Sequence, residues 1–162
     1  MASYREHILQ AQNNLAFLKG ISANLDRPYW DWCVTTCFYV GVHLVNSHIA
    51  IKGDLHYRRH DEVSEAISPY NQLSLAKVPD EVYTAYRHLQ NLSRRSRYLI
   101  SEKMGNRGED AFLTFDKHFQ RALRSLDVLL DYITSQYLEP FDKTEVDCGI
   151  HKNIVLNNFS LK

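Results

Sequence analysis

Histidine is concentrated in one part of this chain. His43, His48, His56 and His60 lie within a stretch of 18 residues, out of eight histidines in all. Imidazole titrates near neutral pH, so it suits general acid–base catalysis and metal binding. Arg97 follows on a later segment, and its planar guanidinium suits bidentate contact with phosphate. We therefore take His43, His56, His60 and Arg97 as the candidate catalytic residues.

These side chains leave several kinds of site open. Zinc needs three or four ligands converging at about 2 Å, with an oriented second shell. The sequence has neither an H-E-x-x-H motif nor a paired C-x-x-C, so we assign no metal ligand and expect no cofactor. A cationic rim for phosphate, with His56 and His60 beside Arg58 and Arg59, fits the pattern better. Ordinary surface histidines remain the alternative.

The stretch from Pro28 to Gly53 predicts one long central helix. Proline suits a first helical position, and glycine is a natural stop. Most of the circumference of this helix is apolar, which predicts that other helices surround it. Cys33 and Cys37 lie one turn apart within it, and we expect both to be small buried thiols.

A narrow polar line nevertheless follows this helix. It consists of Thr36, Tyr39, His43 and Ser47, with Thr35 and Asn46 beside it. Each polar group left unpaired in a core costs about 1–3 kcal/mol, so the line needs partners. Either it faces a second helix and finds them there, or it forms the floor of a cleft.

Composition describes an ordinary globular chain. With 162 residues, 44% hydrophobic and 23% charged, it fits one domain with a real core. The formal net charge is zero, so an anionic ligand must be met by a local patch. Three cysteines do not form a secreted disulfide framework. The first residues lack an apolar secretory core and no run of 18 apolar residues occurs, so we expect a cytoplasmic protein without a membrane segment.

The remaining pattern is helical as far as residue 138. Ser3 and Glu6 form a capping box, S-x-x-E, at the start of the first helix. The expected elements are a helix from there to about Ala23, a link over 24–27, a short helix over 61–67, a helix opened by Pro79 that runs to about Met104, a turn at Gly105–Gly108 and a last helix from Glu109 to about Leu138.

The helix opened by Pro79 carries several basic side chains that differ in position. Arg87, Arg94 and Tyr98 fall opposite its apolar seam, where they are solvated. Arg97 falls on the edge of the seam, so we expect it to be half-buried and held in one pose. We take Tyr39, Arg94 and Tyr98 as candidate ligand-binding residues.

The fold class that follows is all-α. We expect an up-down bundle of four long helices plus one short helix over residues 1–138. Residues 139–162 lose the helical period but keep apolar side chains. We expect them to form an irregular tail that docks on the body or on a second subunit.

A set of residues in this order resembles the HEPN superfamily. The set is Trp32, Phe38, Tyr39 and His43 on the central helix, then His56 and His60, then Tyr86, Leu89, Ser93, Arg94, Arg97 and Tyr98. The similarity covers roughly residues 28–138. It implies a small helical bundle, often a homodimer. Many such proteins are metal-independent ribonucleases in toxin–antitoxin, CRISPR-linked or other prokaryotic defence systems, and others bind nucleotides or partner proteins without catalysis.

The chain departs from the nuclease motif of that superfamily. Its nucleases carry an arginine followed by a histidine after four to six intervening residues, and no arginine here has a histidine at that spacing. Any catalysis must therefore use a different arrangement, with His43, His56 or His60 as general acid or base and Arg97 stabilising the phosphorane charge.

Three functions compete on this basis. The first is a protein that handles RNA or a nucleotide, with a degenerate or atypical nuclease site. The second is a non-catalytic protein–protein interaction module that uses the tail and the face of Arg87, Arg94 and Tyr98. The third is a histidine-rich metal site.

Overall fold

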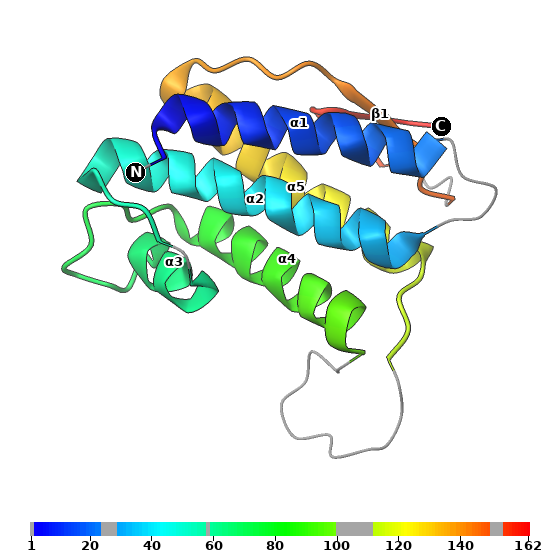
Figure 1. Cartoon of the computed structure of the whole chain (residues 1–162), viewed down its shortest axis with the longest axis horizontal. Helices are drawn as coiled ribbons and strands as arrows, with labels where there is room; N and C mark the ends of the chain where they lie inside the picture. Colours follow the sequence, from blue (N-terminus) through cyan, green and yellow to red (C-terminus); the bar gives the residue numbers. More distant parts are fainter. Residues whose placement is uncertain (1, 24–28, 58, 100–111, 150–153) are drawn as a thin grey trace.

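The long helices of this chain form a bundle in which each runs opposite to the long helix before it in the sequence, while α2 and α5 run in the same direction (Figure 1). The computed structural model describes residues 2–23, 29–57, 59–99, 112–149 and 154–162. Its elements are α1 (Tyr4–Ala23), α2 (Trp30–Gly53), α3 (His60–Ile67), α4 (Asp80–Tyr98), α5 (Asp116–Tyr137), β1 (Thr144–Val146) and β2 (Phe159–Leu161). The predicted bundle of four long helices and one short helix is therefore confirmed.

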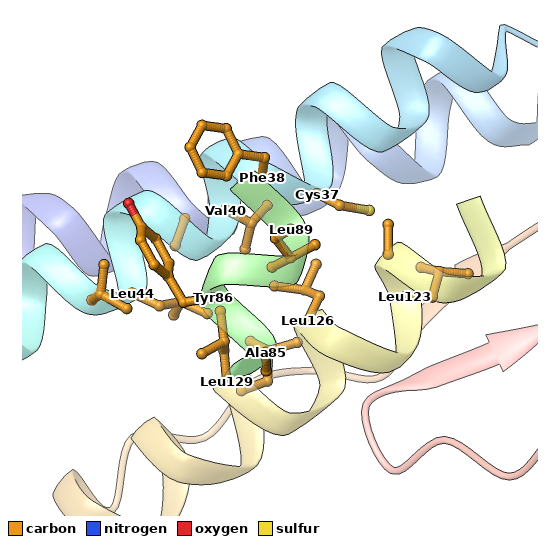
Figure 2. Close-up of a cluster of buried hydrophobic side chains, with 14 of the residues drawn as sticks. Cys37, Phe38, Val40, Leu44, Ala85, Tyr86, Leu89, Leu123, Leu126 and Leu129 are labelled. Atoms are coloured by element: carbon orange, nitrogen blue, oxygen red, sulfur yellow. The ribbon is translucent and has the colours of Figure 1, made fainter. Parts of the chain in front are cut away.

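Helix α2 is the centre of the bundle, because α1, α4 and α5 all pack against it. Phe38 and Leu44 of α2 are fully buried, in one apolar cluster with Leu89 of α4 and Leu126 of α5 (Figure 2). Burying a side chain of this size contributes about 1.5–3 kcal/mol. The wide apolar arc read from the sequence thus corresponds to three neighbouring helices.

The same helix passes a simple test for a membrane span. Within the described ranges, only α2 is long and apolar enough to cross a bilayer by length and composition. In the structure, 72% of its most apolar window is buried inside the protein. The core helix of a soluble protein satisfies that test equally well.

Gly41 marks the closest approach within this core. A Cβ atom at this position would lie 3.0 Å from Leu89 Cδ1 and 3.1 Å from Leu129 Cδ1. Glycine inside a helix costs about 1 kcal/mol relative to alanine. Close packing of α4 and α5 against α2 accounts for a glycine here.

The helix ends follow recognisable capping chemistry. The predicted capping box forms at the start of α1, where the Glu6 carboxylate accepts the Ser3 N–H at 2.7 Å and Ser3 Oγ accepts the Glu6 N–H at 3.4 Å. At their other ends, α2, α4 and α5 are followed by Asp54, Leu99 and Leu138 in the left-handed conformation.

The predicted start of the last helix, at Glu109, is wrong for the described residues. Residues 112–115 are not helical, and α5 begins at Asp116. The ring nitrogen Nδ1 of His118 accepts the backbone N–H of Phe115 at 3.0 Å, which satisfies a donor at the start of α5. A side chain that caps a helix from its third position was not part of the sequence prediction.

Side chains of α4 hold the extended segment that precedes α5. Arg95 donates to the carbonyl oxygen of Leu113 from Nε and Nη2, at 3.1 and 2.9 Å. Its guanidinium also lies 5.3 Å from the centre of the Phe112 ring. Ser96 Oγ and Thr114 Oγ1 form a further hydrogen bond of 3.0 Å. These tertiary contacts outweigh the apolar spacing that suggested a helix.

Some sequence expectations lie outside the described residues. They are the link over 24–27 and the turn at Gly105–Gly108. Two helix bounds are wrong: the central helix begins at Trp30 rather than Pro28, because Tyr29 is not helical. The helix after Pro79 ends at Tyr98 rather than near Met104, because Leu99 takes the left-handed conformation.

The tail after α5 lies against the body of the same chain. Strands β1 and β2 pair in parallel, with Thr144 opposite Phe159 and Val146 opposite Leu161. Strand β1 packs against α1. The loss of helical period after residue 138 was predicted, whereas the pairing of two tail segments was not.

One carboxylate of α5 holds the strand at the end of the tail. Asp127 is buried, and its carboxylate accepts the backbone N–H groups of Asn157 and Asn158 at 2.9 and 2.8 Å. It also accepts the Asn158 side-chain amide at 3.0 Å. Asp131, one turn later, accepts both asparagine amides at 2.7 and 2.8 Å. This aspartate–asparagine clasp fixes the tail before β2.

We expect Asp127→Ala to lower the free energy of unfolding by about 2–3 kcal/mol. The substitution leaves two backbone N–H groups and one amide without their acceptor, and each unsatisfied donor costs about 1–3 kcal/mol when buried. Urea unfolding measures the change. The exposed Asp142→Ala should stay within about 0.5 kcal/mol of wild type. Coincident unfolding curves for Asp127→Ala and wild type would contradict the role of the clasp.

Candidate functional site

Three imidazole rings from different segments form a hydrogen-bonded row. His7 of α1 lies in the middle, with its Nδ1 3.1 Å from Nδ1 of His43 on α2. On the other side, His7 Nε2 lies 3.1 Å from Nδ1 of His56, in the connection between α2 and α3. The His7 and His43 rings are tilted by 40° with centroids 5.4 Å apart, whereas the His7 and His56 rings are stacked at 20° with centroids 5.1 Å apart. We call these three residues the imidazole row.

The row can move a proton. A neutral imidazole has one N–H donor and one acceptor nitrogen, so His7 donates to one neighbour and accepts from the other. Burial, reinforced by His43 and then His56, lowers the pKa of His7 to about 4. Burial and the His56 ring also lower the pKa of His43. His7 is therefore neutral at pH 7 and relays hydrogen bonds between the two outer rings.

The geometry of the row does not suit a metal ion. The two nitrogens of His7 face different neighbours, whereas ligands to one ion must aim at one point. Within the part of the chain that the structure describes, no three or more histidine, cysteine or acidic side chains are placed to hold a metal. Cys33 and Cys37 are buried free thiols, as the sequence suggested.

A second cluster surrounds the Phe38 ring. The guanidinium carbon of Arg97 lies 5.8 Å from the centre of this ring, and His60 packs edge-on against it at 5.0 Å. Arg97 is half-buried, as the sequence predicted, and no carboxylate of the described residues forms an ion pair with it. A cation that is partly removed from water without a counter-ion makes a site attractive to anions. We call Arg97, His60 and Phe38 the arginine cluster.

Hydrogen-bonding groups near this cluster are unused. His60 Nδ1 and Ser93 Oγ are buried and have no hydrogen-bond partner among the described residues. Ser93 lies one helical turn before Arg97, whose Nε donates to the Ser93 carbonyl at 3.4 Å. Burial and the adjacent Arg97 charge lower the pKa of His60, so its ring is neutral near pH 7. The cluster therefore offers a fixed cation beside a neutral imidazole.

Two exposed aromatic rings flank the arginine cluster. Tyr39 is 40% exposed, and its ring centroid lies 5.9 Å from that of Phe38. Tyr98 is 62% exposed, and its ring lies 5.1 Å from the Arg97 guanidinium. Arg94 is exposed and makes no hydrogen bond or ion pair with described residues. Tyr39 and Tyr98 thus join the site, and Arg94 stays apart on the solvated side.

The four predicted catalytic residues are joined as two pairs. His43 and His56 belong to the imidazole row, and His60 and Arg97 belong to the arginine cluster. In the described residues no hydrogen bond or ring contact links one pair to the other. Tyr39 lies between them, since its ring contacts Phe38 and it precedes His43 by one helical turn. The structure therefore does not bring all four residues into one site: they lie in two groups, and the expectation of a single shared cleft is not met among the described residues.

Two further side chains of the polar line bond to the backbone of α2 itself. Ser47 Oγ donates to the Leu44 carbonyl at 2.7 Å, and Asn46 Nδ2 donates to the Val42 carbonyl at 3.0 Å. Both side chains are buried and bond to the backbone of their own helix. The end of the line near Gly53 is therefore closed, and only the part around Tyr39 and His43 is accessible.

His48 also belongs to the core rather than to the site. Its Nε2 lies 3.1 Å from the Ala76 carbonyl oxygen, and the Tyr137 hydroxyl lies 2.6 Å from its Nδ1. A carbonyl oxygen cannot donate, so Nε2–H is the donor and Nδ1 accepts from Tyr137. Burial lowers the pKa of His48 to about 4. The residue ties α2, the connection before α4 and the end of α5 together.

His7 is the residue that the sequence interpretation missed. A usable signal was present, because His7 precedes Ala11 by four residues and lies next to Ile8 on the apolar seam of the first helix. A histidine at the edge of a buried seam needs a polar partner. The sequence does not say which segment supplies that partner.

Comparisons of this chain with protein-family models, with curated proteins and with solved structures found no match.

We expect the protein to lose stability as pH falls from about 6.5 to about 4. The folded pKa of His7 lies near 4, below the ordinary value of 6.5, so the unfolded chain binds more protons in this window. His48 and His118 have folded pKa values near 4 and act in the same direction. Urea midpoints measured across this range test the slope.

His7→Gln isolates the contribution of the row. A glutamine amide also donates and accepts, so it can bridge His43 and His56 without titrating. We expect this variant to keep its stability at pH 7 and to show a shallower loss toward pH 4, by about 1 kcal/mol. Identical pH profiles for His7→Gln and wild type would contradict a buried, neutral His7.

Proposed function

We propose that this chain is a HEPN-like protein that binds RNA or a ribonucleotide at the arginine cluster. The observation that carries the proposal is a half-buried Arg97 with no acidic partner among the described residues, beside His60 and two exposed aromatic rings. A phosphate supplies the missing negative charge, and the guanidinium contacts it through two N–H groups. Neutral overall charge agrees with a local rather than a global anion site.

The aromatic rings favour a nucleotide over a simple anion. Single-stranded RNA is commonly bound by stacking its bases on aromatic side chains next to a basic group. Tyr39, beside Phe38, and Tyr98, beside Arg97, offer such rings. In this proposal the phosphate lies at Arg97 and His60, and a neighbouring base stacks on Tyr39 or Tyr98.

Cleavage of RNA is a second candidate function, favoured by the imidazole row. In metal-independent cleavage a base removes the proton of the 2′-hydroxyl, O2′ attacks phosphorus, and an acid protonates the leaving 5′ oxygen. We propose His43 for one of these steps; its position one turn from Tyr39 and its hydrogen bond to His7 support this choice. The row then passes the proton toward His56.

The biological setting is proposed from the resemblance alone. It suggests a cytoplasmic homodimer in a prokaryotic defence or toxin–antitoxin system. Lack of the superfamily's arginine–histidine spacing is the reason we rank binding before cleavage.

We expect Arg97→Ala to weaken binding of a fluorescein-labelled single-stranded RNA at least about tenfold. A hydrogen bond to a charged group contributes about 1.5–3 kcal/mol, and 1.4 kcal/mol corresponds to a tenfold change in affinity. Fluorescence polarisation at fixed salt measures the dissociation constant. Arg97→Lys keeps the positive charge but loses the planar guanidinium, so its affinity for RNA should lie between those of wild type and Arg97→Ala.

The matched control for Arg97 is Arg124→Ala. It removes the same charge from an exposed position on α5 and should change affinity little. Urea unfolding establishes that Arg97→Ala remains folded. Equal affinity of wild type and folded Arg97→Ala would refute binding at the arginine cluster.

If the protein cleaves RNA, the reaction should persist in EDTA and should depend on His43. We expect His43→Ala to lower the cleavage rate about 100-fold or more, in the range seen for loss of a general acid or base. His88→Ala is the control, because His88 bonds to Ser125 between α4 and α5. Gel analysis of end-labelled RNA gives both rates. Undiminished cleavage by His43→Ala would remove the imidazole row from the mechanism.

A further inference from the structure

A hollow of about 390 Å³ lies beside α3, among residues that neither the imidazole row nor the arginine cluster uses. Its size falls within the range of ligand clefts, about 300–1,000 Å³. The end of α2, helix α3 and the connection between α3 and α4 supply its walls. The lining residues relevant here are Ile49, Leu55, Glu62, Glu65, Leu73 and Leu75. We call this the α3 hollow.

Leucine side chains at the hollow face solvent. Leu73 is 93% exposed, Leu75 is 77% exposed and Leu55 is 47% exposed. Single exposed leucines are common on protein surfaces. Three that line one hollow form an apolar patch, and such patches mark interaction sites.

The backbone that displays these leucines is held in place. Asn71 Oδ1 accepts the Leu73 N–H at 3.1 Å, while Asn71 Nδ2 donates to the Glu65 carbonyl at 3.2 Å. Ser74 Oγ donates to the carbonyl oxygen of Ala66 and accepts the Ala76 N–H at 3.1 Å. The leucines are therefore displayed by an ordered turn, which lowers the entropic cost of docking a partner.

The charged side chains that line the hollow are acidic. Glu62 and Glu65 both line it, and among the described residues no basic side chain does. In the described part of the chain the ion pairs join Arg59 to Asp61 and Lys162 to Glu145, so neither lining glutamate is paired. A partner that buries the leucines must bring positive charge to these carboxylates.

We propose that the α3 hollow docks an amphipathic, basic segment of another protein. Apolar side chains of that segment enter between Leu55, Leu73 and Leu75, and its Lys or Arg side chains pair with Glu62 and Glu65. A second copy of this chain fits less well, because a two-fold contact through this face would bring the same carboxylates together. The site is separate from the proposed RNA site.

Panning a phage-displayed library of short linear peptides on the full chain tests the proposal. Phage that also bind the Leu73→Ser/Leu75→Ser variant are removed first. We expect the enriched peptides to combine large apolar residues with Lys or Arg. A synthetic copy of an enriched peptide should bind wild type at least tenfold more tightly than Leu73→Ser/Leu75→Ser or Glu62→Lys/Glu65→Lys.

Controls separate this site from general stickiness and from the RNA site. Leu138→Ser removes an equally exposed leucine outside the hollow, 87% exposed, and should leave peptide affinity unchanged. RNA binding by the leucine double variant should equal that of wild type. No enrichment, enrichment of acidic peptides, or equal peptide affinity in all variants overturns the proposal. Self-association that disappears in Leu73→Ser/Leu75→Ser also overturns it, in favour of a second copy.

Discussion

Burial of α2 is the constraint on which the rest of the molecule depends. Helices α1, α4 and α5 all pack against this helix. The packing therefore fixes the positions from which their side chains contact the partly exposed residues of α2. His7 of α1 hydrogen-bonds to His43 of α2. Tyr86 and Arg97 of α4 both lie against the Phe38 ring of α2. The imidazole row and the arginine cluster are thus positioned by the same hydrophobic core. A change that shifts α2 would displace both.

The sequence allowed the helices and their approximate bounds to be predicted, because local chemistry determines them. The capping box at Ser3 acts within a single turn, and α2 ends at Gly53 as predicted, although Asp54 rather than the glycine takes the left-handed conformation. The start of α5 and the pairing of β1 with β2 depend on contacts between distant segments. The spacing of apolar residues placed Phe112 and Phe115 on the face of a predicted helix. It gave no sign of the α4 side chains that hold this segment in an extended conformation.

The candidate site shows the same division. Helical geometry correctly separated the half-buried Arg97 from the solvated Arg94. Periodicity also placed Ser47 and His43 on one polar line, yet Ser47 bonds to its own helix while His43 bonds to α1. The sequence of one helix predicts which residues share a face, but the hydrogen-bond partner of each residue depends on a second segment as well. His7 escaped prediction for that reason.

The hydrogen bonds of the imidazole row couple the tautomers of its three rings, because each ring nitrogen in the row either donates or accepts. When all three rings are neutral, the row has two tautomeric arrangements, and the ring nitrogen without a proton lies at the His43 end in one and at the His56 end in the other. A molecule that takes a hydrogen bond from His43 thereby selects what His56 offers to its own surroundings. The tautomers of His43 on α2 and His56 in the connection before α3 are therefore coupled through His7, and this coupling needs no displacement of the backbone.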